Sequence, residues 1–126
     1  MFEIRMGVPE MKTLWDSLST KNKNGTLSED ETKLYKKLSK ALRFLSQNPR
    51  HRGLGSHEID PLSRRYGEKV WQSYLENNTP AAGRMFWVYG PGKSEITVIG
   101  LEPHPEDTKS AGYAKVHLSA KGTEAP

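Results

Sequence analysis

The sequence predicts a small α+β domain, in which an antiparallel meander sheet, an N-terminal strand and two helices on one face pack together. Three observations predict this class. Apolar residues recur at helical spacing in the first half, β-branched and aromatic runs occupy the second half, and the turns between those runs are short. Consecutive strands with short turns form a meander, and the helices must cover its apolar face. We expect one domain over 1–120 of the 126 residues and a frayed tail over 121–126.

Composition limits the size of the core and the kinds of protein that this chain can be. Only 34% of the residues are hydrophobic, so the core should be small, and no run approaches the ~18–20 apolar residues of a membrane span. The opening MFEIRMGV carries an acid and an arginine within its apolar stretch, which is not typical of a signal peptide. The chain has no cysteine, which excludes disulfides and thiolate chemistry. We therefore expect a cytoplasmic protein with no membrane partner.

The first half predicts a strand followed by two helices. Apolar residues alternate with Glu3 and Arg5 over 2–8, as in a strand, and Pro9 can open a helix near 9–20. A second helix near 28–47 should begin with a capping box formed by Ser28 and Glu31, and should end at Asn48-Pro49. Its apolar stripe is Leu34, Leu38, Ala41, Leu42 and Leu45. Its cations are expected to be mostly solvated: Lys36, Lys37, Lys40 and Arg43.

The second half predicts the meander. Residues 53–67 hold several Gly and Pro breakers and are expected to be irregular, whereas 68–78 should form a strand. The runs 81–90 and 95–104 should form a hairpin around the turn Pro91-Gly92-Lys93-Ser94. A last short strand is expected over 114–119.

This hairpin should bring polar residues to one end of the sheet. With a turn centred near Gly92, Arg84 should lie opposite Gly100 or Leu101, and Glu102 and His104 should follow at the same end. A guanidinium, a carboxylate and an imidazole in one place are suited to handling a phosphate.

Each of these residues also has a simpler interpretation. Arg84 can be a solubilising charge on an edge strand, and His104, between Pro103 and Pro105, can simply end a strand. Glu102 can merely pair with Arg84, which would make it a poorer base. Tyr74 should lie opposite Arg84 if the turn at 77–80 is tight, either as a platform for base stacking or as part of the core. Trp71 and Trp87 are expected in the core.

Positive charge is concentrated in the middle of the chain. The net charge is +4, and the basic residues gather between positions 50 and 69. They are Arg50, Arg52, Arg64, Arg65 and Lys69, with His51 and His57 among them. An anionic partner, either nucleic acid or an acidic protein segment, fits this cluster, and an ordinary solvated loop is the alternative. His51 and His57 have no recognised ligand spacing, so we expect no metal and no cofactor.

Three segments resemble the RelE/ParE superfamily of bacterial toxins. NPRHRGLGSHEID (48–60) is similar to the family's "DPRHPxLxxH" segment, and GRMFWVYG (83–90) is similar to its "YRIVYRV" strand. ITVIGLEPHPED (96–107) is similar to its closing strand, which often ends in "GxHxxxY". Three features depart from the family, one of them an insertion-like stretch over 19–30 that makes the chain longer than a minimal member. Arg50, His51 and Arg52 stand where some members have paired lysines, and Pro105 follows His104 where some have a tyrosine.

The resemblance implies the toxin of a toxin–antitoxin pair. Several members are endoribonucleases that cut messenger RNA on the ribosome through attack by the ribose 2′-hydroxyl, and they need no metal for it. Carried onto this sequence, the catalytic residues are Arg84, Glu102, His104 and Tyr113. The RNA-binding residues are Arg50, His51, Arg52, His57, Arg64, Arg65 and Tyr74. The expected partners are a cognate antitoxin, messenger RNA and the ribosome. A ParE-type toxin that binds DNA gyrase without catalysis, and an inactive partner-binding member, remain alternatives.

Overall fold

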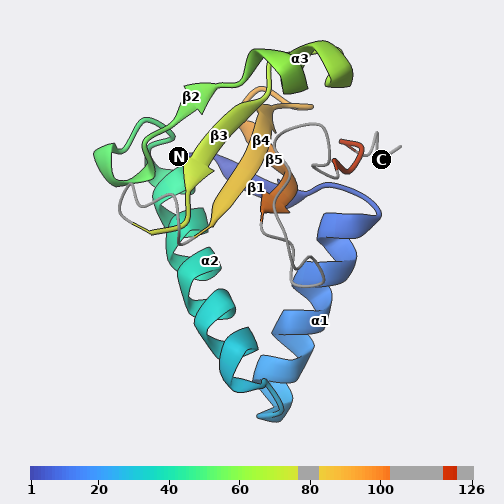
Figure 1. Ribbon diagram of the computed structural model, residues 1–126, viewed down its shortest axis with the longest axis vertical. Coiled ribbons are helices and arrows are strands. Elements are labelled where there is room, and N and C mark those ends of the chain that lie inside the picture. Colours follow the sequence, from blue (N-terminus) through green and yellow to red (C-terminus); the bar gives the residue numbers. More distant parts are fainter. Residues whose placement is uncertain (77–82, 103–117, 122–126) are drawn as a thin grey trace.

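The structure is a computed structural model, and it describes residues 1–76, 83–102 and 118–121 (Figure 1). The described elements are β1 (Glu3–Met6), α1 (Glu10–Asn24), α2 (Glu29–Gln47), the 3-10 turn η1 (Arg52–Leu54), β2 (His57–Glu58), α3 (Asp60–Tyr66), β3 (Trp71–Tyr74), β4 (Arg84–Tyr89) and β5 (Glu95–Glu102). Their strands form a five-stranded sheet in the order β1-β5-β4-β3-β2. The predicted α+β class is confirmed. Among these helices none is long and apolar enough to cross a bilayer.

The predicted meander is present as β3, β4 and β5, which are antiparallel neighbours. The sheet as a whole is mixed, because the N-terminal strand β1 pairs in parallel with β5. Parallel neighbours need a long crossover, and here the whole chain between β1 and β5 supplies it. Most of the expected strand over 114–119 and most of the expected tail lie outside the described residues. Within the described part, Ala120 forms an isolated bridge with Val8.

The prediction that 53–67 is irregular was wrong. This stretch contains η1, the short strand β2 and the seven-residue helix α3. Pro61 lies in the first turn of α3, where its missing N–H costs nothing, and Gly67 ends the helix with a φ of 92°. The Gly and Pro residues that suggested a loop therefore mark the ends of a helix that is too short to show a periodic apolar pattern.

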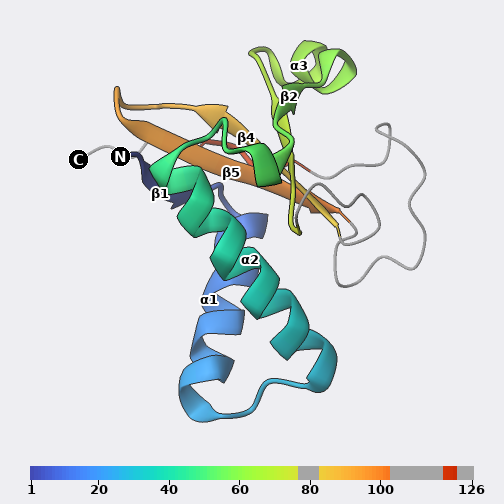
Figure 2. The same cartoon turned by 90° about the vertical axis from the view of Figure 1, so that its left-hand side faces the viewer.

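Helices cover both faces of the sheet (Figure 2). The two predicted helices, α1 and α2, pack on one face together with Met85 and Trp87 of β4. The unexpected helix α3 packs on the other face, where Phe86 and Val88 meet Leu62. A strand that is buried on both faces needs a continuous apolar run, which explains MFWV at 85–88.

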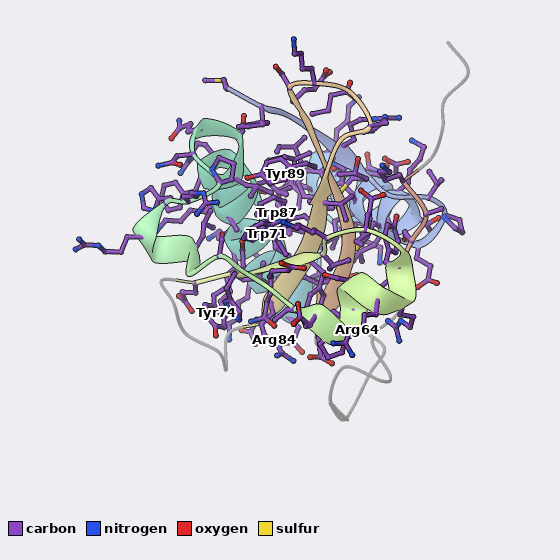
Figure 3. The ribbon with its side chains drawn as sticks, turned by 90° about the horizontal axis from the view of Figure 1, so that it is seen from above. Arg64, Trp71, Tyr74, Arg84, Trp87 and Tyr89 are labelled. Atoms are coloured by element: carbon purple, nitrogen blue, oxygen red, sulfur yellow. The ribbon has the colours of Figure 1, made fainter. Side chains whose placement is uncertain are left out.

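The apolar stripe of α2 faces the sheet as predicted. Leu38 and Leu45 are both 0% exposed and belong to the core on the α1–α2 face. Trp71 and Trp87 are cross-strand partners whose rings stack with centroids 5.8 Å apart, and Tyr89 meets Trp87 edge-on at 5.1 Å (Figure 3). Trp87 is therefore in the core, as expected, whereas Trp71 is half-buried and packs against it.

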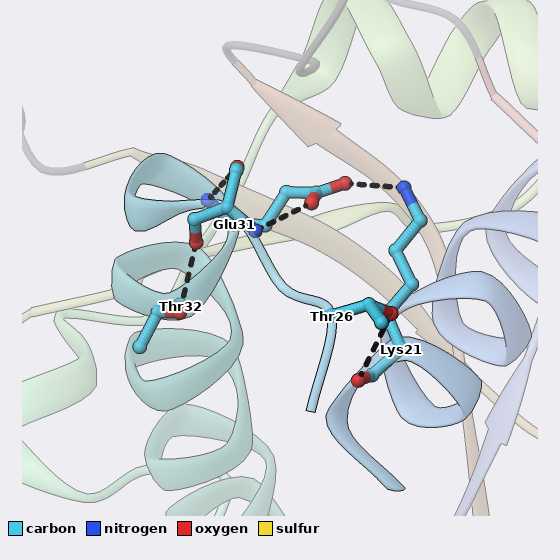
Figure 4. Close-up of polar contacts among 5 residues, drawn as sticks. Lys21, Thr26, Glu31 and Thr32 are labelled. Carbon is cyan, nitrogen blue, oxygen red and sulfur yellow. Dashed lines mark hydrogen bonds and ion pairs between the residues drawn. The ribbon is translucent and has the colours of Figure 1, made fainter. Parts of the chain in front are cut away.

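The predicted capping box is present at the start of α2, and its glutamate also links α2 to α1 (Figure 4). The N–H of Glu31 donates to Ser28 Oγ at 3.1 Å, and the N–H of Ser28 donates to Glu31 Oε1 at 2.9 Å. The other carboxylate oxygen of Glu31 accepts from Lys21 Nζ at 2.7 Å, which joins the two helices. The Lys21 ammonium and the Ser28 N–H hold the pKa of Glu31 below its usual value.

Candidate functional site

Three polar residues lie side by side where the meander ends. Tyr74 on β3 is the cross-strand partner of Arg84 on β4, and Arg84 is the partner of Glu102 on β5. Direct cross-strand partners project from the same face of a sheet, so these side chains form a row. The expectation that Tyr74 lies opposite Arg84 is confirmed.

The expectation that Arg84 lies opposite Gly100 or Leu101 was wrong by one or two residues. Phe86 pairs with Gly100 while the next residue, Trp87, pairs with Val98, so Ile99 is the extra residue of a β-bulge. The bulge shifts the register between the turn and the strand end. As a result Glu102, a carboxylate, faces Arg84 in place of a glycine or a leucine.

Gly83 precedes β4 and has a backbone conformation that favours glycine. Its φ is 111°, in the region that favours glycine, and a Cβ at this position would lie 2.9 Å from Leu75 Cδ1. The chain therefore passes close to Leu75 immediately before Arg84.

Arg84 is held on three sides. Its Nη1 donates to Gln72 Oε1 at 3.2 Å, and its Nη2 forms an ion pair with Glu102 Oε1. The guanidinium also lies over the ring of Phe86, with its Cζ 5.8 Å from the centroid, which places it on the α3 face of the sheet. The Arg84 side chain keeps 21% of its area exposed, whereas Glu102 keeps 8%. The cation is thus oriented and still within reach of solvent.

A second line of polar contacts runs from Arg84 through Gln72 to His57, at the edge of the sheet. Gln72 contacts His57 across a long 3.5 Å between Nε2 atoms, and His57 Nδ1 lies 3.0 Å from the carbonyl oxygen of Gly55. Because a carbonyl can only accept, Nδ1 carries the proton of the neutral ring and Nε2 accepts from the Gln72 amide. Donors and acceptors therefore alternate from Arg84 through Gln72 to His57.

The basic residues predicted to bind RNA are divided between two places. Arg64 and Arg65 are exposed on α3, and Arg64 lies along the same margin of the molecule as Arg84 and Tyr74 in Figure 3. Arg50 instead lies over the ring of Trp71, at 5.6 Å, on the face covered by α2.

The rest of the basic loop lies near α2. His51 stacks on Phe44 with ring centroids 4.4 Å apart, and Arg52 is exposed on η1. The basic residues of 50–65 therefore do not form one continuous surface.

Two predicted catalytic residues, His104 and Tyr113, lie outside the described residues, so their convergence with Arg84 stays a prediction. Gln72 was missed in the sequence because one glutamine in a strand carries no special signal. Period-two alternation could have found it, since it places Gln72 on the face of Tyr74. Within the described ranges, no group of three or more His, Asp or Glu could hold a metal ion.

Comparisons with known proteins add nothing to this geometry. No protein-family model, curated protein or solved structure matches the chain. The fold and the polar row at the strand ends are therefore the observations from which a function has to be argued.

Proposed function

We propose that this chain is the toxin of a toxin–antitoxin pair and that it acts as an endoribonuclease on messenger RNA, working on the ribosome. The observation that carries the proposal is the state of Arg84. Its guanidinium is oriented by Gln72 and Glu102 and still keeps 21% of its side-chain area exposed. A held, accessible arginine is suited to two phosphoryl oxygens of an RNA backbone.

The proposed reaction needs no outside nucleophile. The 2′-oxygen loses its proton and attacks the neighbouring phosphorus, and the bond to the 5′-oxygen breaks. The products are a 2′,3′-cyclic phosphate and a 5′-hydroxyl, so the protein has to move two protons and stabilise the charge on the phosphorane. Arg84 would stabilise that charge.

The proton-transfer groups are assigned as follows. The acceptor nitrogen of His57 is directed at Gln72, so this histidine serves to hold Gln72 and, through it, Arg84. Glu102 is engaged by Arg84 and acts as its counter-ion. His104 remains the residue that we propose for proton transfer, with Tyr113 as the second candidate.

Expression of the protein in bacteria tests the proposal. The wild type should arrest growth and leave cleaved messenger RNA with 2′,3′-cyclic phosphate ends. Arg84→Ala should lower the cleavage rate roughly 10²–10³-fold, by analogy with the loss of one oxyanion-hole donor. His104→Ala should lower it roughly 10²–10⁴-fold. Arg43→Ala is the matched control, because Arg43 is exposed on α2 away from the strand ends.

One observation favours the second candidate, a toxin that binds DNA gyrase without catalysis. Arg84 already has a carboxylate partner, as a purely structural arginine would. If His104→Ala arrests growth as well as the wild type does, the ribonuclease mechanism fails and gyrase binding takes its place. Both candidates require an antitoxin. A small neighbouring gene whose product abolishes the arrest would therefore support either toxin, and the RNA ends would separate them.

A further inference from the structure

A groove beside the polar row carries residues that the proposed reaction does not use. It lies between α2, η1 and the end of β3, and its volume is about 520 Å³. Three lysines of α2, Lys36, Lys37 and Lys40, line one wall. Tyr74 lines the opposite wall, and it is also the cross-strand partner of Arg84. Tyr74 therefore links the polar row, on the α3 face of the sheet, to a groove on the face that α2 covers.

The groove is strongly positive. Lys37 pairs with Glu76 across it, at 3.6 Å between Nζ and Oε1. In the described part of the chain, Lys36 and Lys40 have no carboxylate partner, and both are exposed. Residues four apart on a helix project from the same side, so these two ammonium groups point along one wall. Two uncompensated cations in a row are suited to successive negative charges of a chain.

Two aromatic rings that stack on each other line the groove, together with the apolar residues Ala41, Leu54 and Leu75. Phe44 and His51 both line it, and their rings are nearly parallel, with 6° between the planes. Lys40 Nζ lies 5.7 Å from the centroid of Phe44. Flat rings beside cations are the arrangement that binds single-stranded nucleic acid, because bases stack on the rings and phosphates meet the cations. A purely acidic polypeptide such as polyglutamate would use the cations but has no ring to stack on Phe44 or His51.

We infer that this groove holds the part of the RNA strand next to the cleaved bond, with its phosphates on Lys36 and Lys40 and a base against the Phe44–His51 stack. The inference rests on the proposed function, since it extends the path of the same RNA past Tyr74. It assigns a task to two lysines that a sequence pattern marks only as the solvated side of a helix.

Salt-dependent binding of a non-cleavable RNA tests the inference. The probe is a fluorescent single-stranded oligoribonucleotide with 2′-O-methyl riboses, which lack the attacking hydroxyl. The double variant Lys36→Gln/Lys40→Gln should bind it more weakly. Its slope of log K against log salt should be smaller by about 1.4, because each phosphate contact on a single strand contributes roughly 0.7. The matched control Lys23→Gln/Lys33→Gln removes the same charge from exposed lysines that do not line the groove, and should keep the wild-type slope.

A second variant tests the stacking surface. Phe44→Leu keeps an apolar side chain and every charge, so the salt slope should not change. Affinity should fall roughly 5- to 150-fold, the range expected when one base loses its aromatic partner. Circular dichroism of each variant checks that the fold is retained.

Each remaining outcome decides between the inferences. If the wild type cleaves RNA but the groove pair binds like the control pair, the groove assignment fails and the ribonuclease stands. If no RNA is cleaved and only the groove pair loses affinity and slope, the groove stands as an RNA site and the ribonuclease fails. If polyglutamate of equal length displaces the probe as well as unlabelled RNA does, the groove belongs to an acidic polypeptide, and the RNA assignment is overturned.

Discussion

Replacement of Ser73 by Ala should destabilise the protein, because Ser73 accepts a hydrogen bond from the buried indole of Trp87. The indole N–H of Trp87 donates to Ser73 Oγ at 2.8 Å, and Ser73 Oγ lies 2.6 Å from Ser56 Oγ. The Ser56 hydroxyl donates to the carbonyl of Pro49 at 2.7 Å, so the Ser73 hydroxyl must donate to Ser56. Three hydrogen bonds in series thus tie β4 and β3 to the loop that carries Arg50 and His51.

The magnitude follows from burial. Ser73 is 0% exposed and Trp87 is 1% exposed, so Ser73→Ala leaves the indole N–H buried without an acceptor. An orphaned buried donor costs about 1–3 kcal/mol. Ser73→Ala also removes the hydrogen bond between Ser73 and Ser56. Ser56 keeps its bond to Pro49 and is only partly buried, so the loss of that second bond adds little. Urea unfolding should therefore give a free energy of unfolding about 1–3 kcal/mol below that of the wild type.

A double-mutant cycle can refute this reasoning. Trp87→Phe removes the indole N–H, so Ser73→Ala should cost about 1–2 kcal/mol less in that background than in the wild type. Ser17→Ala, at an exposed position of α1, is the control and should change stability by less than about 0.5 kcal/mol. An equal cost of Ser73→Ala in both backgrounds would show that the orphaned indole is not the cause.

Three further predictions concern the scaffold. Leu38→Ala should lower the free energy of unfolding by about 2–5 kcal/mol, because Leu38 is 0% exposed in the core. Gly83→Ala should destabilise the start of β4, since a Cβ there meets Leu75 at 2.9 Å and the φ of 111° strains it; RNA cleavage should fall with the displacement of Arg84. Glu31→Gln keeps the capping box but loses the charge, so its stability should respond less to acid than that of the wild type.

The sign of the Glu31 prediction follows from its lowered folded-state pKa. The contribution of ionised Glu31 to the free energy of unfolding is complete above pH 4.5, the ordinary pKa of a glutamate. It is lost as the pH falls through the lower pKa of the folded state. Thermal melts of the wild type and Glu31→Gln should therefore converge as acid is added. A difference in Tm between the two proteins that stays constant as the pH falls would contradict the ion pair with Lys21. For the core prediction, a cost below about 1 kcal/mol for Leu38→Ala would contradict its burial, and unchanged cleavage in Gly83→Ala would separate Arg84 from that glycine.

Several elements could be predicted from the sequence because local chemistry specifies them. The capping box of Ser28 and Glu31 lies within one helical turn, and Asn48 ends α2 where proline follows. The hairpin of β4 and β5 is held by a short turn, and Tyr74 faces Arg84 because β3 and β4 are consecutive strands. In each case the interacting residues are close in the chain, so their pattern can be read directly.

Other features depend on contacts between residues far apart in the chain and could not be predicted from the sequence. The bulge at Ile99 brings Glu102 opposite Arg84, and no residue near Ile99 in the sequence predicts it. The helix α3 is stable because Leu62 packs against Phe86, a contact that its seven residues do not reveal.

The position of the basic residues follows the same rule. Arg50 meets Trp71 and His51 meets Phe44 because η1 folds back toward α2, whereas α3 carries Arg64 and Arg65 to the other face. The sequence alone does not show on which face of the sheet a charged side chain will lie. The fold assigns it a face when buried apolar contacts fix the backbone, and for this reason the lysines of α2 became a groove wall only in three dimensions.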